Sequence, residues 1–168
     1  GHDALTGDLD VTYKLRKYGF KIAYTLDAIS YTQDPISLSQ YKNQMRRWYG
    51  GGWQSLKKHF RVIISRPNRA LEMSLIYIEG ILFSLFLFAL PLINVRLSLY
   101  FILGNIAFNM LFAIAASIKE KRFDILFVPF IYPFMIYINA FIFLEQGIKE
   151  VVLNKKNLIW FHPERVKI

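Results

Sequence analysis

Apolar residues are spread unevenly along the chain. Up to about residue 73 they are interspersed with polar and charged residues, whereas beyond it they form three long stretches, at 74–93, 97–118 and 125–144. Each stretch is long enough to cross the roughly 30 Å hydrocarbon core of a bilayer, and the second and third contain no charged residue. We therefore expect an α-helical transmembrane region at 74–144, followed by a basic tail at 145–168.

The first part of the chain, 1–34, predicts a helix followed by a strand. Apolar residues recur at helical spacing within 9–18, and Gly19 is suited to end this helix. These apolar residues are Val11, Leu15 and Tyr18. Roughly alternating apolar residues then predict a strand at 21–25. A helix followed by a strand is typical of an α/β domain, so we expect a mixed fold with an α/β remnant ahead of the helical region.

Two amphipathic helices are expected at 35–73. The first covers 38–49 and ends at the glycines 50–52. The residues suited to open it are Pro35, Ser37 and Ser39. The second begins at Trp53 and places apolar residues on one side and lysines and arginines on the others, which is the pattern of a helix lying in the membrane interface.

A polar and aromatic face is expected on the first of these helices. Gln44, Arg47 and Trp48 are three and four residues apart, so they share one side of the helix and can meet a single ligand. Their chemistry suits a sugar diphosphate, because a guanidinium binds phosphate oxygens, an indole stacks on a sugar ring and an amide donates to a hydroxyl.

The net charge of +9 is concentrated around the apolar stretches. Lysines and arginines are frequent at 57–69 and again at 119–122, whereas the connection between the first two stretches offers only Arg96. Cytoplasmic loops carry the excess of positive charge, so the N-terminal part and the second connection are predicted to lie in the cytoplasm. We expect the cations to meet lipid headgroups, with no nucleic acid partner.

The same charge bias does not decide on which side of the membrane the basic tail at 145–168 lies. Three complete crossings would place the basic tail outside, against the charge bias. Either the bias is broken here, or the third stretch, which contains Pro129 and Pro133, is kinked or re-entrant.

Candidate metal ligands are sparse. The chain has no cysteine, and His2, His59 and His162 lack the spacing of metal ligands, so we interpret the histidines as incidental. Asp8 and Asp10 have the spacing of an Asp-x-Asp motif, which holds a metal and a nucleotide diphosphate at the end of an apolar strand. No such strand precedes them. We therefore interpret Asp8 and Asp10 as acidic residues at a helix N-terminus, where they interact favourably with the helix dipole, and not as a metal-binding motif.

Three motifs follow one another in the first third of the chain. They are Thr6-Gly7-Asp8-Leu9-Asp10, Asp34-Pro35 and Gln44-Met45-Arg46-Arg47-Trp48. With apolar spans behind them, these motifs resemble the membrane-embedded family-2 glycosyltransferases, which include the processive poly-N-acetylglucosamine, hyaluronan, chitin and cellulose synthases. Gly7 departs from the pattern, because many members have Glu at that position.

The resemblance implies roles for individual residues. Asp8 matches the general base that deprotonates the acceptor hydroxyl, and Gln44, Arg47 and Trp48 match the residues that bind the acceptor and the donor diphosphate. Further residues implied to support the site are Asp10, Arg46, Trp160 and Arg165, the last two in a tail segment similar to one that closes over the nucleotide in relatives.

The resemblance also implies the rest of the enzyme. It makes 1–34 the end of a GT-A-like catalytic domain, and a divalent metal, Mg or Mn, is expected on upstream residues that this sequence lacks. We expect a fragment of a longer protein, inactive alone. The whole enzyme would transfer a sugar from a nucleotide-sugar donor to a growing polysaccharide at the cytoplasmic face of the cell membrane. We expect a UDP-linked donor and inversion of configuration at the anomeric carbon of the transferred sugar.

The implied partners are the donor, the polysaccharide acceptor and lipid, and the resemblance leaves room for accessory membrane subunits. The transmembrane region would translocate the product. Two alternatives stay open: a non-processive transferase that glycosylates a lipid once, and a non-catalytic membrane anchor or assembly subunit whose arginines and lysines only bind anionic lipid.

Overall fold

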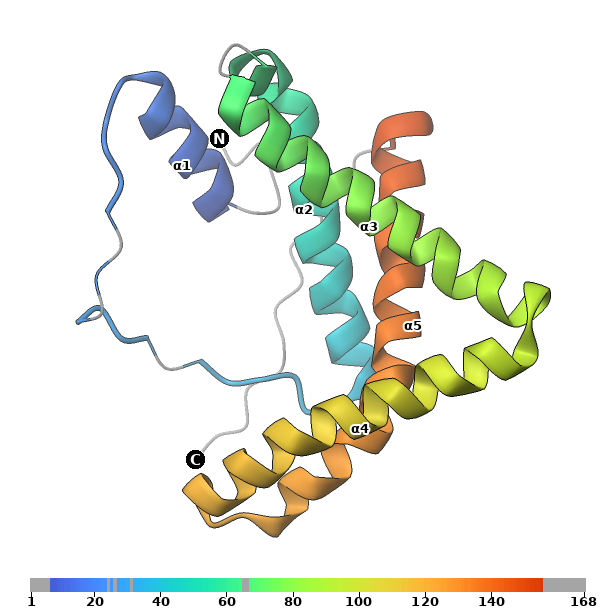
Figure 1. Cartoon of the computed structure of the whole chain (residues 1–168). Coiled ribbons are helices and arrows are strands. Elements are labelled where there is room, and N and C mark those ends of the chain that lie inside the picture. Colours follow the sequence, from blue (N-terminus) through green and yellow to red (C-terminus); the bar gives the residue numbers. More distant parts are fainter. Residues whose placement is uncertain (1–6, 24, 26, 31, 65–66, 156–168) are drawn as a thin grey trace. The chain divides into compact units, whose positions relative to one another are not determined.

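The computed structural model describes residues 7–23, 25, 27–30, 32–64 and 67–155, and every regular element in these ranges is helical (Figure 1). The elements are α1 (Gly7–Lys17), α2 (Leu38–Ile64), α3 (Pro67–Ile93), α4 (Val95–Glu120), η1 (Phe123–Phe127), α5 (Val128–Gly147) and η2 (Ile148–Val152). They belong to two compact units, one made of Gly1–Tyr77 with Ile142–Ile168 and the other of Ile78–Phe141.

The mixed fold expected from the sequence is wrong for the described residues, which are all-helical. The helix predicted at 9–18 is confirmed as α1, but the described residues of 21–25 form no strand. A strand is stable only when a neighbouring strand pairs with its backbone N–H and C=O groups, whereas a helix satisfies these groups internally. The described residues supply no such neighbour, so alternating apolar residues alone do not produce a sheet or an α/β remnant here.

Gly19 ends α1, as predicted. Its φ of 87° lies in the left-handed region, which glycine adopts without strain. The Gly19 N–H donates to the Arg16 carbonyl (3.2 Å) and the Phe20 N–H to the Leu15 carbonyl (3.1 Å). This pair of bonds is the Schellman motif, which satisfies carbonyl groups left over at a helix C-terminus.

Helix α2 begins where the sequence predicted but does not stop at the glycines. Ser37 Oγ accepts from the Gln40 N–H (3.3 Å), and the Gln40 side chain accepts from the Ile36 N–H (3.2 Å), which caps the helix. The predicted end at 50–52 is wrong, because α2 continues to Ile64.

A close approach explains why glycine is tolerated inside α2. A Cβ at Gly52 would lie 2.9 Å from Tyr77 Oη, so the absence of a side chain lets Tyr77 of α3 approach the helix backbone. Glycine inside a helix costs about 1 kcal/mol relative to alanine. Contacts of this kind with distant residues offset that cost, which is why a triple glycine does not break the helix.

Trp53 is the centre of the apolar packing in the first unit. Its indole is buried, lies 4.6 Å from the Tyr77 ring and 5.2 Å from the Phe143 ring between centroids, and donates from Nε1 to the Phe143 carbonyl (3.2 Å). A Cβ at Gly147 would come within 3.1 Å of the indole. Gly147 therefore lets the end of α5 pack directly on Trp53, and α2 is held against that end.

The second unit consists of the rest of α3 and α5 with α4 and η1. Phe86 of α3 packs edge-on against Phe101 of α4 (5.8 Å), and Phe88 of α3 against Tyr137 of α5 (5.9 Å). Asn94 caps α4 by accepting from the Leu97 N–H (3.1 Å). Aromatic pairs between helices and a capped turn thus hold this unit together.

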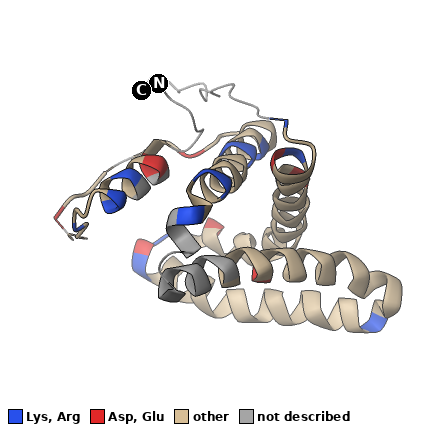
Figure 2. Cartoon of the chain, turned by 90° about the horizontal axis from the view of Figure 1, so that it is seen from above, with Lys and Arg blue, Asp and Glu red and all other residues tan. Residues whose placement is uncertain are grey.

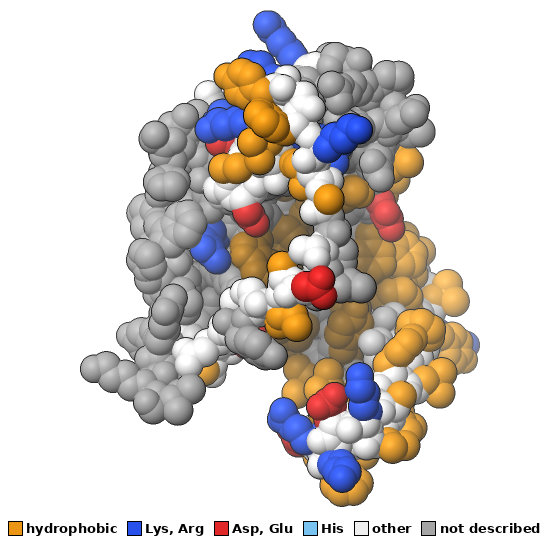
Figure 3. All heavy atoms as spheres, turned by 90° about the vertical axis from the view of Figure 1, so that its left-hand side faces the viewer, with side chains coloured by type: hydrophobic (Ala, Val, Ile, Leu, Met, Phe, Trp, Pro, Cys, Tyr) orange, Lys and Arg blue, Asp and Glu red, His pale blue; other side chains and the backbone are white. Residues whose placement is uncertain are grey.

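Three helical segments are long and apolar enough to cross a membrane: Leu75–Ile93, Val95–Glu120 and Phe123–Val152. They coincide with the predicted stretches, the third being longer than expected. Their apolar side chains lie largely at the surface, as the orange areas of Figure 3 show. Charged residues concentrate on α1 and α2 and are almost absent along the apolar helices (Figure 2). Helices with this distribution are compatible with a membrane location.

Candidate active site

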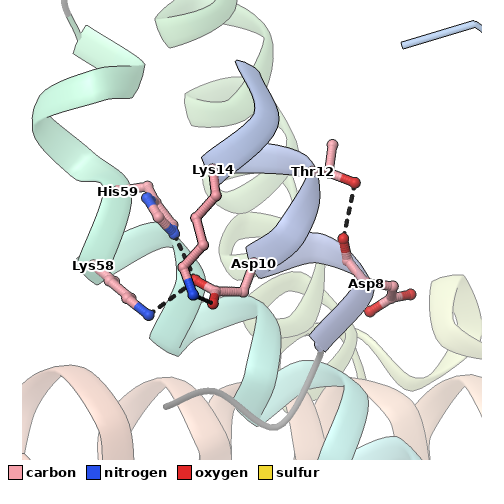
Figure 4. Close-up of polar contacts among 6 residues, drawn as sticks. All are labelled: Asp8, Asp10, Thr12, Lys14, Lys58 and His59. Atoms are coloured by element: carbon pink, nitrogen blue, oxygen red, sulfur yellow. Dashed lines mark hydrogen bonds and ion pairs between the residues drawn. The ribbon is translucent and has the colours of Figure 1, made fainter. Parts of the chain in front are cut away.

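Asp8 lies in the first turn of α1 with its side chain exposed. Thr12 Oγ1 donates to the Asp8 carbonyl (2.8 Å), so the backbone of this turn is held by a side chain one turn later. The Asp8 carboxylate points away from the cluster formed by its neighbour Asp10 (Figure 4). Asp8 thus lies at a helix N-terminus, where the sequence placed it, and acidic residues interact favourably with the helix dipole at that end.

Asp10 is buried and binds three basic side chains. Its Oδ1 lies 2.8 Å from His59 Nε2 and 3.0 Å from Lys58 Nζ of α2, and its Oδ2 lies 2.7 Å from Lys14 Nζ (Figure 4). Burial alone would raise the pKa of the Asp10 carboxyl, but the hydrogen bonds from Lys14, His59 and Lys58 hold the pKa well below its usual range. Asp10 is therefore an ionised bridge between α1 and α2.

The interpretation of His59 as incidental is wrong. An ionised carboxylate can only accept hydrogen bonds, so His59 Nε2 carries the proton in its contact with Asp10. Both side chains are largely buried, at 9% exposure for His59 and 7% for Asp10. His2 and His162 lie outside the described residues.

The described residues do not fit a metal site. No group of three or more His, Cys, Asp or Glu among them could hold an ion. Asp8 and Asp10 point to different sides of α1 in Figure 4, and the oxygens of Asp10 are bound to cations. Asp8-Leu9-Asp10 is therefore not arranged as a metal-holding Asp-x-Asp pair, and no step of the chemistry is assigned to a metal on this chain.

Helix α2 packs through one side. Arg46 Nε pairs with Glu145 Oε2 (3.1 Å), the Tyr49 ring lies edge-on to Phe143 (5.5 Å), and Trp53 packs on the same part of α5. These contacts fix how α2 is rotated about its axis against the end of α5.

The predicted ligand face lies on roughly the opposite side of α2. At about 100° per residue, Gln44, Arg47 and Trp48 leave α2 on a different side from the packed residues. Gln44 and Arg47 are partly exposed, with the Arg47 Nε buried, and Trp48 is 49% exposed. Arg46 and Arg47 therefore leave α2 in different directions, and Arg46 binds Glu145.

Helix α1 contacts α2 on this same face. Lys58 and His59 follow Arg47 and Trp48 by about three helical turns, so all four fall on one side of α2, roughly 16 Å apart along its axis. The structure thus places Asp10, and the turn that carries Asp8, on the side of α2 that carries the Gln-x-x-Arg-Trp motif. That Asp8 and the motif converge on one ligand stays a prediction.

A second polar cluster joins α2 to the residues after α5. Gln54 Nε2 donates to Glu150 Oε1 (2.8 Å), with both residues buried, and Lys57 Nζ donates to Asn154 Oδ1 (2.8 Å) and to the Glu150 carbonyl (3.4 Å). Sequence analysis assigned Lys57 to lipid headgroups and missed this cluster. Its partners are more than ninety residues apart, so no local pattern could indicate it. Trp160 and Arg165 lie outside the described residues.

Comparison with known families identifies the chain. The profile described as glycosyl transferase family group 2 matches residues 2–143. The chain belongs to this family. This glycosyltransferase match takes in Asp8, the whole of α2 and most of the apolar region. Members of the family transfer a sugar from a nucleotide-sugar donor to an acceptor. No curated protein and no solved structure matches this glycosyltransferase chain.

Proposed function

We propose that this chain is the acceptor-binding and membrane part of a processive glycosyltransferase, which extends a polysaccharide with inversion from a nucleotide-sugar donor at the cytoplasmic face of the cell membrane. The observation that carries the proposal is the continuity of the family match through Asp8, the Gln-x-x-Arg-Trp helix and the apolar helices. In this proposal the general base Asp8, the ligand face of α2 and the apolar helices that anchor the chain in the membrane are parts of one enzyme.

Each site residue has a chemical task in this proposal. Asp8 takes the proton of the acceptor hydroxyl as the new glycosidic bond forms, because a neutral hydroxyl is a poor nucleophile. Arg47 stabilises the negative charge that grows on the departing nucleotide diphosphate, and Trp48 offers its exposed indole to a sugar ring, with Gln44 donating to a hydroxyl. A divalent metal on the donor diphosphate would be held by residues outside this sequence.

Contacts within the first unit bear on the side of the tail. Gln54 binds Glu150 and Lys57 binds Asn154, so the polar helix α2 and the residues after α5 are in contact. If α2 and the residues after α5 meet outside the bilayer, they lie on the same side of it, and the chain between them crosses an even number of times. We therefore propose that only two of the three candidate spans cross completely. The basic tail then shares the cytoplasmic side with α2, in agreement with the charge bias.

Cysteine labelling in cells expressing the enzyme tests this topology, because the chain has no cysteine of its own. We expect cysteines at Ser39 in α2 and Lys155 after η2 to resist an impermeant maleimide in intact cells and to react in inverted vesicles. The control, Arg96→Cys in the first turn of α4, should react in intact cells. If only one of the cysteines at positions 39 and 155 reacts in intact cells, the two positions lie on different sides of the membrane and an even number of crossings is refuted.

Product analysis tests the function itself. Membranes containing the intact enzyme are incubated with radiolabelled nucleotide sugars, UDP-linked donors first, and the products are sized. A long carbohydrate chain that elongates with time is expected. A single sugar added to a lipid would instead support the non-processive transferase, and no transfer from any donor would support the non-catalytic anchor.

A further inference from the structure

We propose that Asp10 is a positioning residue for sugar transfer, which fixes the first turn of α1, and with it Asp8, on α2 through His59. The inference rests on the proposed function, because the position of this turn matters for transfer only if Asp8 is the base. The docking itself can be measured without any reaction.

Polar contacts of Asp10 hold α1 against α2. A helix of 11 residues is marginal on its own in water and needs tertiary contacts. The side chains of Val11 and Leu15 in α1 are 52% and 39% exposed. The Asp10 carboxylate, by contrast, is buried and contacts Lys58 and His59 of α2, so it contributes to the docking of the helix.

His59 is the directional partner in this contact. The Lys14 and Lys58 side chains are 47% and 32% exposed. Water can therefore replace Asp10 as the hydrogen-bond partner of their ammonium groups at little cost in free energy. His59 is buried, and an imidazole N–H without its acceptor would be left unsatisfied in the interior. The pair of Asp10 and His59 therefore defines one position of α1, whereas the lysines add attraction without fixing an orientation.

The geometry of α1 links this anchor to the proposed base. Residues two apart on a helix point to nearly opposite sides, so Asp10 faces α2 while Asp8 faces outward, as Figure 4 shows. Both belong to the same turn, and a shift at one is a shift at the other. Displacing a reacting group by about 1 Å can cost about 100-fold in rate, so a loosened anchor is sufficient to lower transfer.

Electron paramagnetic resonance distance measurements test the docking in the intact enzyme. Spin labels on cysteines replacing the exposed Lys17 of α1 and Arg61 of α2 should give a narrow distance distribution. Asp10→Leu, which removes the acceptor, and His59→Leu, which removes the donor, should broaden it. His59→Gln should keep it narrow, because the glutamine amide can donate from about the place of the imidazole Nε2. An unchanged distribution in Asp10→Leu would overturn the docking role.

Kinetics of the same variants, without labels, test the link to transfer. In Asp10→Leu and His59→Leu we expect kcat to fall by about 10- to 100-fold, with the donor KM changed less than about threefold, and His59→Gln should recover most of kcat. Broadened distances with unchanged kcat would overturn the positioning role, as would equal losses in His59→Gln and His59→Leu.

Failure of the proposed base is a separate outcome. If an Asp8→Asn enzyme remains active while Asp10→Leu still broadens the distances, the general-base assignment fails and Asp10 keeps only its docking role. If Asp8→Asn is inactive and Asp10→Leu changes neither distances nor kcat, the base stands and the positioning inference fails.

Discussion

Replacing the proposed base by asparagine, Asp8→Asn, is expected to lower the rate of sugar transfer by about 10²- to 10⁴-fold, the range that general-base catalysis contributes. An amide cannot take a proton from the acceptor hydroxyl at neutral pH. Because Asp8 is exposed at the start of α1, the change should leave membrane insertion and the amount of protein unaltered. Initial rates of transfer from labelled donor, at equal enzyme in the membrane, measure the effect.

Asp27→Asn is the matched control, because Asp27 is an exposed aspartate outside the helices. It undergoes the same chemical change and should retain transfer within about twofold, since surface substitutions away from special contacts have small effects. Comparable activity in Asp8→Asn and Asp27→Asn would contradict the assignment of Asp8 as the base.

Arg47→Ala is expected to be the second most damaging change, lowering kcat/KM by about 10²- to 10³-fold. Removing one preorganised group that stabilises transition-state charge typically costs this much. Arg46→Ala makes a sharp comparison, because the two arginines are adjacent on α2 and the Arg46 side chain pairs with Glu145. Steady-state kinetics with varied donor concentration separate the two.

Arg46→Ala should cost less than about tenfold in kcat/KM. The Arg46 side chain is 40% exposed, and Glu145 keeps an ion pair with Lys149 Nζ at 2.6 Å when Arg46 is removed. Its effect should fall on stability in detergent rather than on turnover. Equal losses of kcat/KM in Arg46→Ala and Arg47→Ala would show that the division of α2 into a packed side and a ligand side is wrong.

Local patterns in the sequence predicted most helices but not their full extent. The periodicity of α1, its end at Gly19 and the three apolar stretches are properties of neighbouring residues, so the sequence alone indicated them. The end of α2 was misjudged because the glycines at 50–52 are a local stop signal, whereas Tyr77 packing on Gly52 is a contact with another helix. The strand at 21–25 failed for the related reason that a strand needs a partner elsewhere in the chain.

The candidate site was predictable only as a set of residue types. Spacing was enough to place Gln44, Arg47 and Trp48 on one face of a helix. It could not separate Arg46 from Arg47 by partner, because Glu145 lies 99 residues from Arg46. The role of His59 was missed for the same reason, since its partner Asp10 is 49 residues earlier and belongs to a different helix.

At the wide turn η2, the contacts with α2 depend on the number of residues in the turn as well as on which residues they are. The Leu153 N–H donates to the Ile148 carbonyl (2.9 Å), five residues back, so the turn holds about one residue more than an α-helical turn. Loss of one residue here would return the turn to α-helical winding and remove the extra residue that it accommodates. Glu150 lies inside the turn and Asn154 just after it, so a single-codon deletion at this point in a descendant gene would disturb their contacts with Gln54 and Lys57, while the contacts of Phe143 and Glu145 with α2, which precede the turn, would remain.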